Sequence, residues 1–165
     1  MPTTRVIELK QILDGLARMR DPENEPSPED QPLFDEAVAN FLRGGPLLLD
    51  EATEFMWAYY RSVASQFGPT ERASYGIPEL APGSDIWDQV EFPSNPPTLR
   101  RGGTRLEPGP SYISFEGEVT WEPEHGLQLV FEHGLRVCKV GPFDDHNTNA
   151  HAFGDESLID VVFKD

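Results

Sequence analysis

Residues 112–140 decide the fold and read YISFEGEVTWEPEHGLQLVFEHGLRVCKV. Apolar and polar side chains alternate along the first ten of these residues, and the apolar set is Ile113, Phe115, Val119 and Trp121. A period of two is typical of a β-strand with one buried face. The stretch therefore predicts that the last third of the chain forms a β-sheet.

A short repeat marks the turns of this sheet. Glu124-His125-Gly126-Leu127 recurs eight positions later as Glu132-His133-Gly134-Leu135. A solenoid repeat needs roughly 20 or more residues, so the repeat instead indicates two tight turns on either side of a strand from Leu127 to Phe131. We expect the next strand over Leu135 to Val140 and a fourth over Leu158 to Phe163, which together make an antiparallel meander.

Helical patterns precede the sheet. Apolar residues three and four apart predict a first helix between Val6 and Met19. A second helix begins near Asp30, and we expect Gly44-Gly45-Pro46 to end it. Asp50 then caps a third helix, which ends at Gly68-Pro69.

These patterns predict a single α+β domain over residues 1–165, with N-terminal helices packed on a C-terminal antiparallel β-meander. Residues 1–68 are expected to form the helical part and residues 111–165 the sheet. Residues 69–110 are rich in glycine and proline and predict an irregular connection, in which only Ile86 to Phe92 has the pattern of a strand or short helix.

The charge of the chain restricts its partners. It contains 13 Lys and Arg against 29 Asp and Glu, which gives a formal net charge of −16. Such a charge repels phosphate backbones and anionic lipid, so we expect no nucleic-acid and no membrane partner. A protein with a basic surface is the natural complement; the oligomeric state stays open.

Cys138 is the only cysteine, which rules out an intramolecular disulfide and fits a reducing compartment. The N-terminal residues lead into an amphipathic pattern instead of an apolar signal sequence. No apolar run approaches the roughly 18 residues of a membrane span. We expect a cytoplasmic protein.

The meander predicts one functional cluster. If the strands alternate in direction, the turn after Trp121 and the loop after Val140 lie at the same end of the sheet. Carboxylates, amides and imidazoles gathered there would bind a divalent cation, or pair a general acid with a base. The candidate cluster consists of Trp121, Glu122, Glu124, His125, Asp145, His146, Asn147 and Asn149.

Part of this cluster has the spacing of a calcium loop. Its candidate metal ligands, at relative positions one, three, five and twelve, are Asp145, Asn147, Asn149 and Glu156. The sequence departs from the motif at position six, where Ala150 replaces glycine, and its flanks predict strands instead of helices. The alternative is that Asp and Asn side chains organise the loop by bonding its backbone.

Several candidate residues also have structural explanations. His125 and His133 each precede a glycine at a turn and need only tolerate that position. Trp121 on the inner side of a strand is explained as a core anchor. A nucleophilic pair of Cys138 with His133 or His146 is a weaker alternative to a buried thiol. The basic residues Arg100, Arg101 and Arg105 either hold an anion or pair with the surplus carboxylates.

The segments WEPEHGLQ (residues 121–128) and DHNTNA (residues 145–150) resemble a family of uncharacterised bacterial domains. The family shows a Trp-Glu-x-Glu-His-Gly segment and a downstream Asp-x-His-x-Thr-Asn-Ala-like loop. Asp145 stands where that family often has glycine beside the histidine. The resemblance implies a fold boundary and no catalytic residue. Similar small acidic bacterial proteins are often encoded beside toxins as their immunity partners.

Two functions follow from these observations. We favour a non-enzymatic acidic interaction protein, of the immunity type that inhibits a basic toxin or enzyme, with no cofactor. The alternative is a domain that binds calcium or zinc, or a metal-dependent enzyme, with its site at one end of the sheet.

Overall fold

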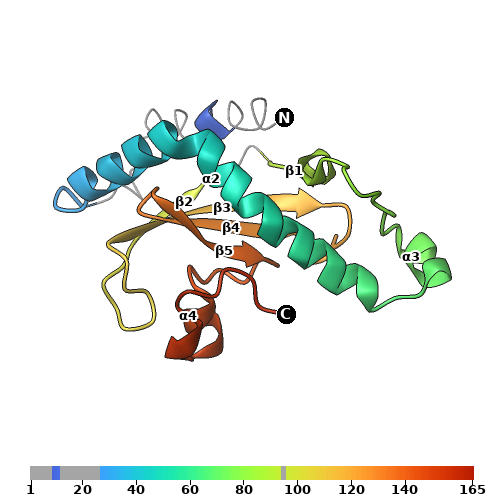
Figure 1. The fold of residues 1–165 in the computed structure, drawn as a ribbon. Coiled ribbons are helices and arrows are strands. Elements are labelled where there is room, and N and C mark those ends of the chain that lie inside the picture. The colour runs from blue at the N-terminus through green and yellow to red at the C-terminus, as the bar shows by residue number, and fades with distance from the viewer. Residues whose placement is uncertain (1–8, 12–26, 94–95) are drawn as a thin grey trace.

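The structure is a computed structural model that describes residues 9–11, 27–93 and 96–165. A long helix lies across a five-stranded antiparallel sheet, which confirms the α+β class (Figure 1). The helices are α2 (Gln31–Ser65), α3 (Pro69–Tyr75), α4 (Asn149–Phe153) and the 3₁₀ turns η1 (Ile86–Gln89) and η2 (Glu156–Leu158). The strands are β1 (Val90–Glu91), β2 (Thr98–Arg101), β3 (Ser111–Val119), β4 (Leu127–Glu132) and β5 (Arg136–Gly141).

Helix α2 is continuous where the sequence predicts a break. Gly44-Gly45-Pro46 lies inside it, and Asp50 is an interior residue instead of a cap, so both predictions are wrong. Figure 1 shows α2 changing direction about half-way along its length, as an interior proline requires. An interior proline costs about 3 kcal/mol. Burial of the Leu48 and Leu49 side chains stabilises the fold by about 1.5–3 kcal/mol each. This offsets the cost of the proline, so the helix stays continuous.

The predicted end of this helix at Gly68-Pro69 is close to the observed one, since the last helical residue is Ser65. The first predicted helix, over Val6–Met19, lies largely outside the described residues. Residues 9–11 of it are helical, and Leu9 is fully buried in the core. Within the described ranges, no helix is both long and apolar enough to cross a membrane.

Strands β3, β4 and β5 confirm the three predicted strands of the meander. The fourth predicted strand, Leu158–Phe163, is wrong. Asp155 Oδ1 accepts a hydrogen bond from Ser157 N (2.9 Å) and starts η2 there, so the chain turns before an extended segment forms. Only Val162 O reaches β5, where it accepts a hydrogen bond from Val140 N (2.9 Å).

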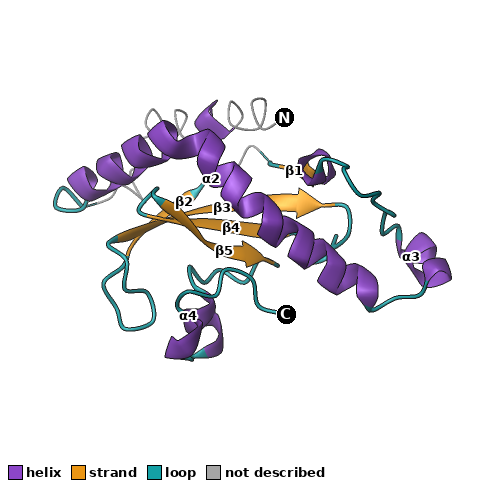
Figure 2. Cartoon of the chain, viewed as in Figure 1, coloured by secondary structure: helices purple, strands orange, loops and turns teal. Residues whose placement is uncertain are grey.

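The expected irregular connection, residues 69–110, contains more structure than predicted. Ile86 to Phe92 does hold a short helix and strand, η1 and β1, but α3 and β2 were not expected (Figure 2). Strands β1 and β2 both pair with β3, and β2 runs from the Thr98–Ser114 pair to the Arg101–Ser111 pair. Strand β2 is short, and it is stabilised by pairing with residues of β3 that are 10 to 16 positions away in the sequence. The sequence pattern of β2 alone does not reveal this pairing.

The two faces of the sheet are covered differently. Phe115 and Phe131 on the inner face pack against Phe41 of α2, at ring-centroid distances of 5.4 and 4.9 Å. Figure 1 shows α4 and the loop between β2 and β3 on the opposite side of the sheet from α2. On this outer face, buried Gln128 and Lys139 form part of a polar layer.

A β-bulge sets the direction of Lys139. Val130 pairs with Lys139 and Phe131 with Val137, so Cys138 is the extra residue of β5. A bulge re-aims the side chains that follow it. Cys138 joins a small outer apolar cluster with Val130, and Lys139 lies beside it with 2% of its surface exposed.

The repeat predicts two tight turns, and the β4–β5 turn is one of them. The other prediction is wrong, because the β3–β4 connection is longer: its last pair is Gly117 with Leu127, and residues 118–126 lie between them. His133 and Gly134 have φ values of 48° and 68°, as the two central residues of a type I′ turn require. Asn40 of α2 donates a hydrogen bond through Nδ2 to His133 O (3.1 Å). The turn is therefore seated against the first half of α2.

Candidate functional site

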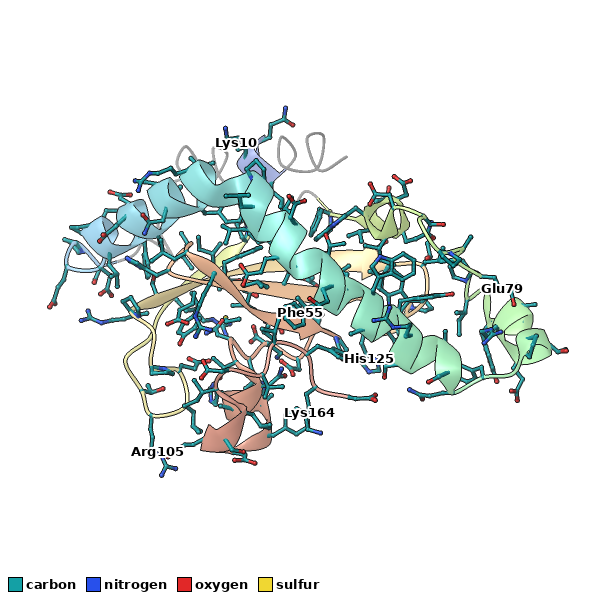
Figure 3. The ribbon with its side chains drawn as sticks, in the orientation of Figure 1. Lys10, Phe55, Glu79, Arg105, His125 and Lys164 are labelled. Atoms are coloured by element: carbon teal, nitrogen blue, oxygen red, sulfur yellow. The ribbon has the colours of Figure 1, made fainter. Side chains whose placement is uncertain are left out.

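The β3–β4 turn brings three of the predicted residues together. Glu122 Oε1 accepts hydrogen bonds from Glu124 N (3.1 Å) and His125 N (3.2 Å), which folds the turn around the Glu122 carboxylate. One possible ligand atom from each of Glu122, Glu124 and His125 lies within 4.8 Å of the others (His125 is labelled in Figure 3). Two carboxylates and an exposed imidazole at this separation are compatible with a divalent metal ion.

Trp121 precedes this turn but does not face it as a ligand platform. It is 1% exposed, and its ring contacts Tyr59 and Tyr60 of α2 edge to face, each at a centroid distance of 5.7 Å. Tyr59 also donates a hydrogen bond to Gly126 O (2.8 Å). Burial raises the pKa of Tyr59, and the nearby charge of Glu122 raises it further. Trp121 and Tyr59 thus hold the turn against the helix.

The loop after β5 starts beside the turn, as the meander predicts. Phe143 N donates a hydrogen bond to His125 O (3.1 Å). The next residues leave this end of the sheet, because Asp145 accepts hydrogen bonds from Arg100 of β2, at Oδ1 (2.7 Å) and at the backbone carbonyl (2.8 Å).

The register of the sheet shows how far the loop travels. Arg100 pairs with Tyr112, whereas the turn end of the sheet is the pair of Gly117 with Leu127. Tyr112 and Gly117 are separated by about 17 Å along β3, at about 3.4 Å per residue. The predicted cluster is therefore divided: Glu122, Glu124 and His125 stay at the turn, and the loop residues spread across the outer face.

The four residues of the calcium-loop hypothesis have separate partners. Asp145 pairs with Arg100, Asn147 N donates to Glu107 Oε1 (3.1 Å), Asn149 Nδ2 donates to Val161 O (2.7 Å), and Glu156 pairs with Arg105 (2.6 Å). Asp145 has a φ of 63°. Its backbone therefore adopts the left-handed conformation that glycine adopts most easily.

Lys139 anchors the start of the loop. Its Nζ forms an ion pair with Asp144 Oδ1 and donates a hydrogen bond to His146 O (3.0 Å). His146 N in turn donates to Asp144 Oδ1 (2.9 Å). Burial lowers the pKa of Lys139, and the bond to Asp144 opposes that shift. Asp144 and His146 are thus fixed by a buried cation.

Cys138 is placed as a structural residue. It is 2% exposed, and its Sγ lies 3.4 Å from Asn147 O, to which the thiol donates. Burial raises the pKa of this thiol, which disfavours the thiolate that a nucleophile needs. The geometry gives no support to a Cys–His catalytic pair.

A serine, a histidine and a glutamate meet at the β4–β5 turn, which the sequence did not indicate. Ser111 Oγ lies 2.8 Å from His133 Nδ1, and His133 Nε2 lies 3.6 Å from Glu36 Oε2. The composition is that of a catalytic triad, but Ser111 is fully buried and cannot reach a substrate. The three residues connect α2 to the sheet. Glu36 is distant in sequence, so no local signal reveals the contact.

Glutamates gather where β1 meets β3. Glu91 and Glu118 are directly opposite each other in the antiparallel pair, and Glu116 lies two residues along β3 on the same outer face. All three side chains are exposed. Within the described ranges, no basic side chain forms an ion pair with any of them. We call Glu91, Glu116 and Glu118 the acidic face.

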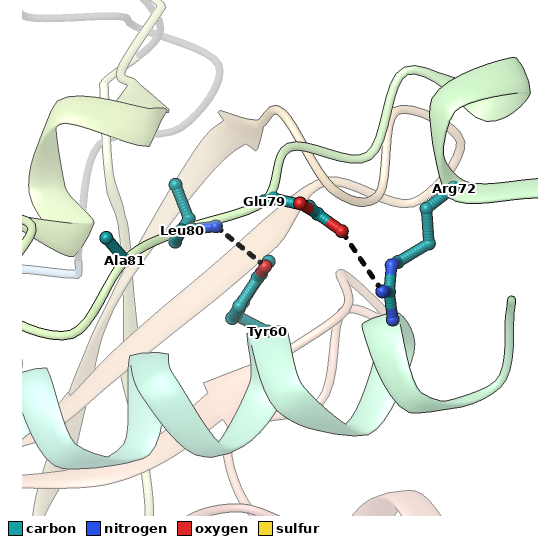
Figure 4. Close-up of a pocket in the computed structure, with 5 residues that line it drawn as sticks. All are labelled: Tyr60, Arg72, Glu79, Leu80 and Ala81. Atoms are coloured by element: carbon teal, nitrogen blue, oxygen red, sulfur yellow. Dashed lines mark hydrogen bonds and ion pairs between the residues drawn. The ribbon is translucent and has the colours of Figure 1, made fainter. Parts of the chain in front are cut away.

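Figure 4 shows a surface hollow at the end of α2. Its polar groups already bond to one another: Tyr60 OH accepts from Leu80 N (3.1 Å), and Arg72 Nη2 pairs with Glu79 Oε1 (3.3 Å). Arg72 Nη1 also donates to Ala64 O near the end of α2 (3.2 Å). These contacts fasten the segment after α3 to the end of α2.

Residues 11–147 match the family described as a domain of unknown function, DUF6985. The chain belongs to this family. The expectation of an uncharacterised domain family is thereby confirmed. The DUF6985 match covers α2, the whole sheet and the β3–β4 turn, and it ends in the loop that crosses the outer face. Comparison with the curated proteins and with the solved structures found no match.

Proposed function

We propose that this protein is a non-enzymatic interaction protein that binds a basic protein through its acidic face, as an immunity-type inhibitor binds a toxin or enzyme. The observation that carries the proposal is the direct opposition of Glu91 and Glu118, with Glu116 beside them. Like charges opposite each other in a sheet are destabilising by roughly 0.2–1 kcal/mol. Lysine or arginine side chains from a partner would reverse this repulsion.

The chain's own basic residues are used elsewhere, which supports the proposal. Arg100 and Arg101 of β2 pair with Asp145 and Asp30, and Lys139 is buried with Asp144. Of the five further arginines among the described residues, three also pair with carboxylates and two lie on α2: Arg72, Arg105 and Arg136 pair with Glu79, Glu156 and Glu132, and Arg43 and Arg61 belong to α2. With a net charge of −16, the chain carries carboxylates without a basic partner, and those of the acidic face would steer a basic protein into contact.

The salt dependence of a complex tests this proposal. Tagged protein would capture a partner from an extract of its host, and the purified pair would be titrated by calorimetry between about 50 and 500 mM salt. We expect the dissociation constant to rise about tenfold or more, because exposed charges are screened over this range, and the partner's own activity to be inhibited in the complex. A complex insensitive to salt, or a partner that stays fully active, contradicts the proposal.

We propose a second candidate function, metal binding, on the geometry of the Glu122–Glu124–His125 cluster. The carboxylate of Glu122 is pre-oriented by two backbone N–H groups, and Glu124 and His125 are exposed. Calorimetric titration with Zn²⁺ and Ca²⁺ tests it. The loss of one bound ion per chain in the Glu124→Gln/His125→Ala variant supports this function, and unchanged binding in that variant contradicts it.

A further inference from the structure

Two histidines lie side by side on the outer face, apart from the acidic face and from the β3–β4 turn. The ring centroids of His146 and His151 are 4.8 Å apart, and the ring planes meet at 83°. His146 belongs to the loop after β5 and His151 to α4, on the side of the sheet opposite α2 (Figure 1). Both side chains are partly exposed, His146 by 38% and His151 by 48%.

A buried carboxylate orients the ring of His151. His151 Nδ1 lies 2.8 Å from Glu107 Oε1, and the Glu107 side chain is only 10% exposed. The same oxygen accepts a hydrogen bond from Asn147 N (3.1 Å), so the carboxylate is held in place. An ionised carboxylate only accepts hydrogen bonds. The proton of the neutral imidazole is therefore on Nδ1, and Nε2 carries the free lone pair.

His146 also lies beside a carboxylate, but it is not hydrogen-bonded to that carboxylate. Its Nδ1 lies 3.4 Å from Asp144 Oδ1, and Lys139 fixes that carboxylate from beneath. The Nδ1 atom is buried and makes no hydrogen bond. Because over a third of the side chain is nevertheless exposed, the Nε2 edge is the part of the ring that faces outward.

We infer that His146 and His151 form a binding site for a divalent transition-metal ion of the Zn²⁺ or Ni²⁺ class, ligated by the two Nε2 atoms. Histidines that ligate metals almost always donate their other N–H to a carboxylate or carbonyl, which fixes the tautomer. Metal–nitrogen bonds of about 2.1 Å place the centres of two adjacent imidazole ligands roughly 4.6–5.3 Å apart. The observed separation of 4.8 Å lies within that range.

The surrounding charges favour a dication. Glu107 brings one negative charge to the far side of the His151 ring, whereas the charge of Asp144 beside His146 is offset by Lys139. The nearby positive charges are already neutralised, since Lys139 pairs with Asp144, Arg100 with Asp145, and Arg105 with Glu156. Only two protein ligands are supplied, so water would complete the coordination.

Nickel titration followed by NMR tests this inference, because the chain has only four histidines and each imidazole gives resolved signals. Paramagnetic Ni²⁺ added below one equivalent should broaden the signals of His146 and His151 together. His133, whose side chain is 11% exposed, is the internal control and should stay sharp. Added Zn²⁺ should displace the Ni²⁺ and restore both sets of signals.

Variants make the test specific. His146→Ala and His151→Ala should each weaken Ni²⁺ binding at least tenfold, while the amide spectrum reports that the chain is folded. Glu107→Gln keeps an acceptor for His151 but removes its charge, and should weaken binding about 10–100-fold. Glu54→Gln, at an exposed position of α2 on the other side of the sheet, should leave this binding unchanged.

The inference would be overturned by no broadening up to millimolar Ni²⁺, by broadening of only one of the two rings, or by equal broadening of every exposed histidine. Broadening of His125 alone would also overturn it, and would instead support metal binding at the β3–β4 turn.

Discussion

Replacing Gly134 by alanine should measure how firmly the β4–β5 turn is seated on α2. A Cβ atom at this position would lie 2.1 Å from Ala37 O and 2.7 Å from Phe41 N. Both atoms belong to the backbone of α2, so neither can move without disturbing the helix. Alanine at the observed φ of 68° costs about 1–2 kcal/mol, and overpacking costs about 1–3 kcal/mol more.

Gly154→Ala is the matched control for this substitution. Gly154 has a φ of 67°, and a Cβ there would meet nothing within 4 Å, so only the backbone strain of about 1–2 kcal/mol applies. The free energy of unfolding would be measured in urea by tryptophan fluorescence. We expect Gly134→Ala to lose about 1–3 kcal/mol more than Gly154→Ala. Equal losses in the two variants would refute the close seating of the turn on α2.

Three further predictions concern the outer face. Asp144→Ala leaves the buried Lys139 unpaired and should cost about 3 kcal/mol of unfolding free energy. Adding Lys139→Met should recover much of that loss, and two equally unstable variants would contradict this. Asp145→Gly should change the unfolding free energy by less than about 1 kcal/mol. Asp145→Val should lose about 1–2 kcal/mol, because valine is strained at the observed φ of 63°. Equal stability of the two variants would argue against a left-handed conformation at Asp145. Because burial raises the pKa of Cys138 above its ordinary 9.0, the folded chain keeps a proton that the unfolded chain releases. Above pH 9 the unfolding free energy of the wild type should therefore fall faster with pH than that of Cys138→Ala, by up to about 1.4 kcal/mol per pH unit. Urea unfolding at several pH values measures both, and an equal dependence on pH in the two proteins would contradict this.

Local patterns were sufficient to predict the centre of the sheet. Alternation along residues 112–121 and the Glu-His-Gly repeat predict β3, β4, β5 and the tight β4–β5 turn, because each feature depends on neighbours in the sequence. The break predicted at Gly44-Gly45-Pro46 failed for the opposite reason. Burial of Leu48 and Leu49 is a tertiary contribution, and it outweighs the local preference against a helix.

The candidate site was predicted only in part for the same reason. Glu122, Glu124 and His125 meet because the turn is local. The path of the following loop depends on Arg100 and Lys139, which no local pattern connects to it. The pairing of Glu91 with Glu118 and the approach of Glu107 to His151 are also contacts between distant residues, and composition and spacing gave no sign of either.

The most direct test of the proposed function compares two variants that have lost the same number of charges. The affinity of each variant for the captured partner is measured. Glu91→Gln/Glu116→Gln/Glu118→Gln removes three charges from the acidic face, and Asp50→Asn/Glu51→Gln/Glu54→Gln removes three from the exposed side of α2. The net charge is the same in both, so a difference between them reports the location of the charges. We expect the first variant to bind about tenfold or more weakly and the second to bind like the wild type. Equal affinities, or a larger loss in the α2 variant, would contradict the acidic face as the binding surface.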